Sequence, residues 1–159
     1  MHSSDIKGIQ KIRIISCLLF IILVLGFCVP ADASAKTTTV MADNNGTITA
    51  YSYKGQKVTV DGVTVSTQEI PSVKIQNIWM VSAQEVFENG LGCNYSYNES
   101  SGKLTLTNQE KGIKASLTVN SKKAVVNGKS YTMSIRVMKA TNGKTGKTGI
   151  LIPASFLAN

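Results

Sequence analysis

The chain has 159 residues, 17 Lys and Arg, 9 Asp and Glu, and a formal net charge of +8. This length allows one domain with a buried core. The only histidine is His2, so the rest of the chain lacks the base of Ser/His and Cys/His nucleophile systems and the usual copper ligand, which excludes those classes of enzyme.

The amino terminus has the pattern of a secretory signal. Basic residues precede an uncharged apolar run, Ile14–Val29, which is followed by Ala33-Ser34-Ala35, a small-residue cleavage site. We expect residues 1–35 to be removed, so that the mature chain begins at Lys36 and is secreted to the cell envelope. An uncleaved anchor is the alternative, although the run has 16 residues and a membrane span needs about 20. Membrane contact is expected only through this segment, if it stays uncleaved.

From Lys36 onward the chain has 14 Lys and Arg against 7 Asp and Glu, a formal net charge of +7. The basic residues occur as singles and pairs rather than in one dense run, so we expect no nucleic-acid partner. A secreted basic protein meets anionic cell-wall polymers and peptidoglycan, and these are the candidate partners. A solvated surface that keeps the protein soluble is the alternative explanation of the charge.

Cys93 is the only cysteine after the predicted signal, so no intrachain disulfide can form. A secreted chain with one core and no disulfide is more typical of bacteria than of disulfide-rich eukaryotic modules. Cys93 lies at a strand start with no evident cation nearby. It is therefore predicted to be a small buried hydrophobe rather than a reactive thiol.

Residues 36–55 are rich in Thr, Asn, Gly and Ala and are predicted to be a flexible leader. The folded part, 56–159, is expected to open with a hairpin turned at Asp61-Gly62. Two further short strands, Val73–Ile75 and Ile78–Val81, follow the break at Ile70-Pro71.

A short capped helix is predicted next, within Trp79–Gly92. Ser82 and Glu85 have the spacing of a capping box, in which the hydroxyl accepts from the Glu85 N–H and the carboxylate reaches back to the Ser82 N–H. Gly90 is predicted to end the helix in a left-handed conformation. Glu85 and Glu88 also have the i, i+3 spacing of paired carboxylates, but the capping role of Glu85 favours structure over catalysis.

Short strands joined by tight turns follow from Cys93 to Lys139 and predict an antiparallel meander, with a second hairpin turned at Asn127-Gly128. A Gly/Lys/Thr loop, Asn142–Thr148, precedes a strand end at Ile150–Ile152. Pro153 then opens a further helix. The fold class expected is therefore α+β, an antiparallel sheet of short hairpins packed on one or two short helices.

An internal repeat relates the two halves of this region. Trp79–Val86, WMVSAQEV, aligns with Ile150–Leu157, ILIPASFL, and each follows a unit that begins with a two-residue hairpin. The second helix stops at Asn159 before it can bury its apolar side. We therefore expect the second half-repeat to be incomplete in this sequence.

Several residues together resemble the copper amine oxidase N-terminal-like domain, or stalk domain, of secreted and wall-associated Gram-positive proteins. They are Val81, Ala83, Val86, Phe87, Leu91-Gly92, Tyr95, Tyr97, Val126-Asn127-Gly128-Lys129 and Ile152-Pro153-Ala154. Ser82 stands where the family often has Pro, and Pro153 keeps that Pro in the second copy. The resemblance implies an antiparallel sheet on short helices that serves as a spacer or attachment module, with no copper chemistry and no cofactor.

The function expected is that of a non-catalytic, secreted cell-envelope module that acts as a spacer or wall-attachment domain. One alternative is the N-terminal stalk of a cell-wall hydrolase, such as an N-acetylmuramoyl-L-alanine amidase, whose catalytic domain lies beyond Asn159. Another is a small-ligand receptor with its site between the half-repeats.

Some short segments match parts of catalytic or phosphate-binding motifs. Lys144-Thr145-Gly146 and Lys147-Thr148-Gly149 match the K-T-G of penicillin-recognising enzymes, but Ser100 and Lys103, spaced as S-x-x-K, lie in a predicted turn instead of opening a helix. The Gly-Lys-Thr triplets lack the glycine that phosphate-loop spacing requires. No catalytic or metal-binding residue is predicted.

Three aromatic residues, Trp79, Tyr95 and Tyr97, are candidates for a glycan-stacking platform. Trp79 lies in an alternating strand before the helix, which favours a place in the core. The exposed, sugar-stacking role is the alternative.

Overall fold

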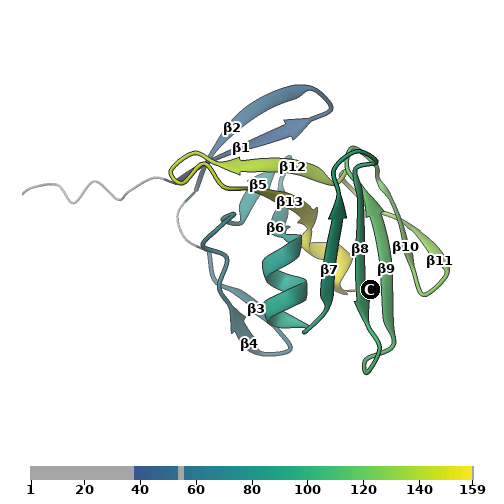
Figure 1. The fold of residues 1–159 in the computed structure, drawn as a ribbon. Helices are drawn as coiled ribbons and strands as arrows, with labels where there is room; N and C mark the ends of the chain where they lie inside the picture. The colour runs from purple at the N-terminus through teal and green to yellow at the C-terminus, as the bar shows by residue number, and fades with distance from the viewer. Residues whose placement is uncertain (1–37, 54–55, 159) are drawn as a thin grey trace, which may run out of the picture. The chain divides into compact units, whose positions relative to one another are not determined.

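A computed structural model describes residues 38–53 and 56–158 (Figure 1). All of them belong to one unit of the chain, Ala35–Asn159. The predicted signal peptide, 1–35, lies outside the described residues. Among the described residues, no helix is both long enough and apolar enough to cross a membrane.

The described strands form three antiparallel sheets. The first has the order β2 (Thr47–Tyr53), β1 (Thr38–Asn44), β12 (Met138–Asn142), β13 (Thr148–Pro153), β6 (Ile78–Ser82), β5 (Val73–Ile75). The second has the order β11 (Lys129–Thr132), β10 (Lys123–Val126), β9 (Ile113–Thr118), β8 (Lys103–Asn108), β7 (Asn94–Asn98). The third is the hairpin of β3 (Val58–Val60) and β4 (Val63–Val65).

Helical structure within the described residues is confined to two short segments. The first, η1 (Glu85–Gly90), is a π-type turn, and the second, η2 (Ala154–Ala158), is a 3₁₀ helix. The antiparallel sheets confirm that part of the prediction, but the fold is largely β rather than α+β. The physical reason is length: six and five residues are too few to make a helical layer, and both segments are held by the sheets around them.

Tight turns with two left-handed residues connect the hairpins. Asp61-Gly62 has φ values of 50° and 80°, and Asn127-Gly128 has 50° and 81°, so both predicted hairpins are confirmed. Asn45-Gly46, with 56° and 88°, and Gln76-Asn77, with 48° and 68°, make the same kind of turn. Positive φ at both central positions matches the twist of the flanking strands and favours Asn, Asp and Gly.

The flexible leader predicted for residues 36–55 is wrong for residues 38–53. They form the hairpin β1–β2, and residues 40–43 of β1 pair with β12, with Val40 opposite Asn142 and Ala42 opposite Ala140. Val40 and Ala42 are fully buried. These two side chains, both on one face of β1, give the hairpin a core to pack on, although its composition is that of a polar linker.

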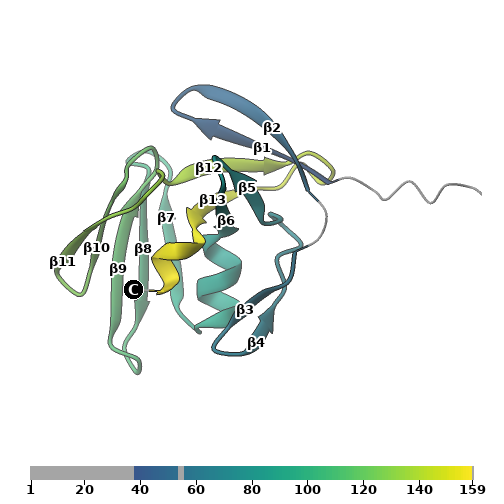
Figure 2. The ribbon, with the colours of Figure 1, turned by 180° about the vertical axis from the view of Figure 1, so that it is seen from behind.

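The two halves of the internal repeat lie side by side. β6 and β13 are antiparallel neighbours in the six-stranded sheet, with Ile152 opposite Val81, and each strand is followed by a short helix. Figures 1 and 2 show η1 between the β3–β4 hairpin and the five-stranded sheet, with η2 beside it. The sequence repeat is therefore also a repeat in space.

The core lies on both faces of these central strands. Val81, Ile150 and Ile152 pack with η1 and the five-stranded sheet, whereas Met80 and Leu151 belong to a second apolar cluster with Val40 and Met138. Strands buried on both faces have continuous apolar runs, as in the Ile150–Ile152 segment. This rigid centre positions the loops described next.

Candidate functional site

The predicted capping box at the start of η1 is only half formed. Ser82 Oγ accepts a hydrogen bond from the Glu85 N–H at 3.4 Å. The Glu85 carboxylate turns away and accepts from the backbone N–H groups of Glu69 and Ile70, at 3.1 and 3.2 Å. Glu85 therefore ties η1 to the segment before β5, a partner distant in sequence that local spacing does not predict.

Gly90 does not end the helix in a left-handed conformation, so that prediction is wrong. The glycine with positive φ here is Gly92, at 65°. A Cβ on Gly90 would lie 2.9 Å from Val65 Cγ2 and 3.1 Å from Val60 Cγ2. Gly90 is thus required for the close approach of η1 to the β3–β4 hairpin.

Cys93 is buried in the core, as predicted. Burial raises the pKa of its thiol, and the nearby charge of Lys111 lowers the pKa by less. A thiol with a raised pKa is a weak nucleophile at neutral pH. The environment fits a packing role.

The three candidate aromatics do not form one platform. Tyr95 and Tyr97 share one face of β7 and line a hollow of about 210 Å³, which Glu99 and Lys139 also line. Trp79 is 39% exposed, belongs to neither core cluster and lines a different hollow, so its predicted place in the core is wrong. Burial, followed by the proximity of Tyr97 and Glu88, raises the pKa of Tyr95 to about 12.

An exposed ion pair lies at the rim of the tyrosine hollow. Lys139 Nζ donates to Glu99 Oε1 at 2.6 Å. This hydrogen bond and the paired charges lower the pKa of Glu99 and raise that of Lys139. Two half-buried tyrosines beside a neutralised pair give this hollow little net charge.

A larger, polar hollow of about 520 Å³ lies where the end of β2, the β4–β5 connection and the Gly/Lys/Thr loop meet. We call it the loop hollow. Its lining residues are Tyr53, Gln56, Lys57, Thr64, Val65, Ser66, Thr67, Gln68, Pro71, Asn142, Lys144 and Thr145. They provide hydroxyls, amides and two ammonium groups, and none is a carboxylate.

Asn142 fixes one wall of the loop hollow. Its buried side chain donates to the carbonyl of Glu69 at 2.8 Å and accepts from the N–H of Lys144 at 2.9 Å. Lys147 forms an ion pair with Glu69 across the same junction. The Gly/Lys/Thr loop is therefore held against the β4–β5 connection, and Lys144 stays exposed at the hollow.

A second hollow of about 200 Å³ adjoins the loop hollow, because Gln56 and Lys57 line both. We call it the Trp79 hollow. Its other lining residues are Val58, Ser72, Trp79, Val81 and Ala154. The Ser72 hydroxyl is buried and, within the described residues, makes no hydrogen bond.

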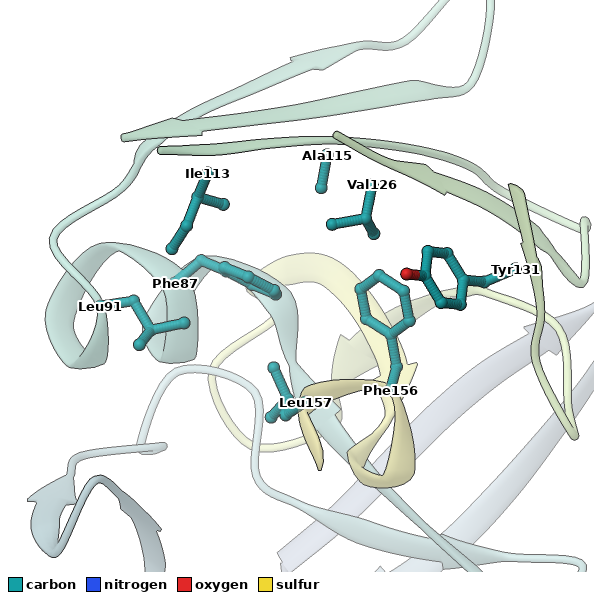
Figure 3. A pocket seen from close by; sticks show the side chains of 8 residues that line it. All are labelled: Phe87, Leu91, Ile113, Ala115, Val126, Tyr131, Phe156 and Leu157. Carbon is teal, nitrogen blue, oxygen red and sulfur yellow. The ribbon is translucent and has the colours of Figure 1, made fainter. Parts of the chain in front are cut away.

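An apolar pocket of about 200 Å³ lies between the two short helices and the five-stranded sheet (Figure 3). Phe87 comes from η1 and Leu91 directly follows it, Phe156 and Leu157 come from η2, and the sheet side is lined by Ile113, Ala115, Val126 and Tyr131. The pocket is the gap left where the two half-repeats meet the sheet, and it brings together no groups for catalysis.

Catalytic motifs considered from the sequence are not assembled in the part of the chain that the structure describes. Ser100 lies in the turn before β8, where its Oγ donates to Asn98 Oδ1 at 2.8 Å, and Lys103 is the first residue of β8. The described residues contain no group of three or more His, Cys, Asp or Glu side chains placed to hold a metal ion.

Sequence reasoning missed Lys57, Ser72 and Lys144 as members of one surface. The only signal was the Gly/Lys/Thr loop, whose triplets lack phosphate-loop spacing. Lys57 and Ser72 directly precede the strands β3 and β5. They come together only in the fold, where Lys57 lines both hollows.

Comparison with known proteins identifies the family. The family described as the copper amine oxidase N-terminal domain matches residues 59–159, more than half of the chain. No curated protein and no solved structure matches the sequence. The match covers the hairpin β3–β4, both half-repeats and the five-stranded sheet, and the chain belongs to the copper amine oxidase N-terminal domain family.

Proposed function

We propose that this chain is a non-catalytic, secreted accessory module that attaches to, or acts as a spacer in, the Gram-positive cell envelope. The observation that carries the proposal is the family match over 59–159, which suggests an accessory domain. The part of the proposal that concerns secretion is supported by the amino-terminal residues, which have the pattern of a secretory signal.

The surface charge supports attachment to an anionic polymer. Among the described residues, the ion pairs involve only Lys139 and Lys147. The exposed lysines outside these pairs are Lys57, Lys74, Lys103, Lys111, Lys114, Lys122, Lys123, Lys129 and Lys144. Unpaired ammonium groups on several elements give long-range attraction to polyanions, and salt screens that attraction.

Co-sedimentation tests the attachment role. The purified protein is mixed with isolated Gram-positive cell walls at increasing concentrations of sodium chloride, and the pelleted fraction is measured. We expect strong pelleting at low ionic strength and progressive release as the Debye length falls below about 10 Å. Absence of pelleting at low salt would contradict attachment and leave the spacer role alone.

Export is tested separately. The intact mass of the protein recovered from the culture medium or envelope of an expressing bacterium should correspond to a chain that begins at Lys36. A full-length mass in the membrane fraction would instead support the uncleaved anchor.

A further inference from the structure

We propose that the loop hollow and the Trp79 hollow together form one binding groove for a hydroxyl-rich anionic chain, a sugar or polyol polymer that carries phosphate or carboxylate groups. We call it the Lys57 groove, because Lys57 and Gln56 line both hollows. The proposal rests on the proposed envelope function and specifies where the polymer binds.

The charge of the groove selects an anion. Lys57 and Lys144 line it, and both are exposed and form no ion pair with another described residue. The lining residues of both hollows include no Asp or Glu. Glu69, the nearby carboxylate, is already neutralised by Lys147. A phosphate or carboxylate entering here meets two ammonium groups and no opposing lining charge, and a lysine ammonium binds either anion as a point charge.

The uncharged groups of the groove match hydroxyls. Gln56, Thr64, Ser66 and Gln68 are exposed in the loop hollow, and their side chains make no hydrogen bond within the described residues. Each can donate to or accept from a hydroxyl group of a ligand. A series of such groups beside two cations suits a polyol better than a simple inorganic anion.

The Trp79 hollow adds two features that independently indicate a ligand. Ser72 is 1% exposed, and its hydroxyl has no hydrogen-bond partner among the residues that the structure describes, although buried polar groups are normally paired. Trp79 is one of the few large apolar side chains with substantial exposure. A sugar or polyol lying on the indole ring would cover apolar surface and could give Ser72 a hydroxyl partner.

Trp79 is also the only tryptophan of the chain, so intrinsic fluorescence reports on this groove. The experiment titrates the full protein with poly(glycerol phosphate) in one arm and with polygalacturonate in the other, at low ionic strength. Binding is followed by the anisotropy of the labelled polymer and by Trp79 fluorescence. The two arms distinguish a phosphate source of the anion from a carboxylate source.

Two double variants with equal net charge separate the groove from general attraction. Lys57→Gln with Lys144→Gln removes both groove cations, and Lys103→Gln with Lys129→Gln removes two exposed lysines outside it. We expect the first variant to weaken binding about tenfold more than the second. We also expect polymer to change Trp79 fluorescence in the parent and control proteins and to change it far less in the groove variant.

Equal losses of polymer affinity in the two double variants would contradict the proposed groove. Saturable binding that leaves Trp79 fluorescence unchanged would contradict it too. Either result would still allow attachment through lysines distributed over the surface. Pelleting with cell walls without binding of either soluble polymer would also overturn the groove. Failure of both assays at low salt would instead contradict the attachment function on which it rests. Circular dichroism of each variant confirms that it is folded.

Discussion

Glu85 Oε2 accepts a hydrogen bond from the backbone N–H of Ile70 at 3.2 Å, and Oε1 accepts one from Glu69. Glu85 is 6% exposed. Glu85→Ala would leave these N–H groups without their acceptor and is expected to lower the free energy of unfolding by about 2–4 kcal/mol. Urea denaturation measures this. Glu88→Ala, on the same helix but without such bonds, should change the free energy of unfolding by less than about 0.5 kcal/mol. Equal effects of the two substitutions would contradict a stabilising role for the Glu85 hydrogen bonds.

Gly90→Ala tests the close approach of η1 to the β3–β4 hairpin. In an ordinary helix this change would stabilise by about 1 kcal/mol. Here the new Cβ would meet Val65 Cγ2 at 2.9 Å, so we expect destabilisation by about 1–3 kcal/mol. Repeating the substitution in a Val65→Ala background should reduce the cost, as a double-mutant cycle reports. The same cost in both backgrounds would exclude this contact as the cause.

The β1–β2 hairpin should contribute to stability, whereas a flexible leader would not. Val40 is fully buried in β1 and Ile48 is 70% exposed in β2. Val40→Ala is expected to cost about 2 kcal/mol, because it removes two buried methyl groups and leaves a cavity. Ile48→Ala should be nearly neutral. Thermal denaturation of both variants compares them, and equal melting temperatures would show that the hairpin does not pack.

Because the pKa of Tyr95 is raised, the free energy of unfolding should depend on pH in the alkaline range. Its pKa is about 12 in the folded protein against 10.0 for an ordinary tyrosine. Between these values the unfolded chain releases the phenolic proton and the folded chain keeps it. The free energy of unfolding should therefore be constant below pH 10 with respect to this group and fall from pH 10 to about pH 12. Tyr95→Phe should flatten this part of the profile in urea denaturation; an unchanged slope would contradict the assignment.

The turns and the central repeat were predictable because their signals are local. Asp61-Gly62 and Asn127-Gly128 need positive φ at adjacent positions, a requirement that the dipeptides themselves reveal. The alignment of WMVSAQEV with ILIPASFL likewise followed from sequence alone. The pairing of these segments as β6 and β13 explains why each copy is apolar on both faces.

What the sequence did not predict depends on contacts between distant residues. Glu85 has capping-box spacing, yet its carboxylate accepts hydrogen bonds from backbone N–H groups 15 and 16 residues earlier in the chain. Gly90 is followed by a glycine that does adopt positive φ, and its own role depends on two valines of a separate hairpin. Lys57 and Lys144 line one hollow although they belong to segments of two different sheets that are far apart in the sequence.

The pairing of β1 with β12 also sets an order for folding. The hairpins β3–β4 and β10–β11 close loops of two residues, whereas pairing Val40 with Asn142 closes a loop of about 100 residues. The entropy lost on closing the long loop is recovered only after the central strands are in place. The amino-terminal hairpin should therefore dock late, and a chain synthesised from that end carries it without a partner strand until β12 has been made.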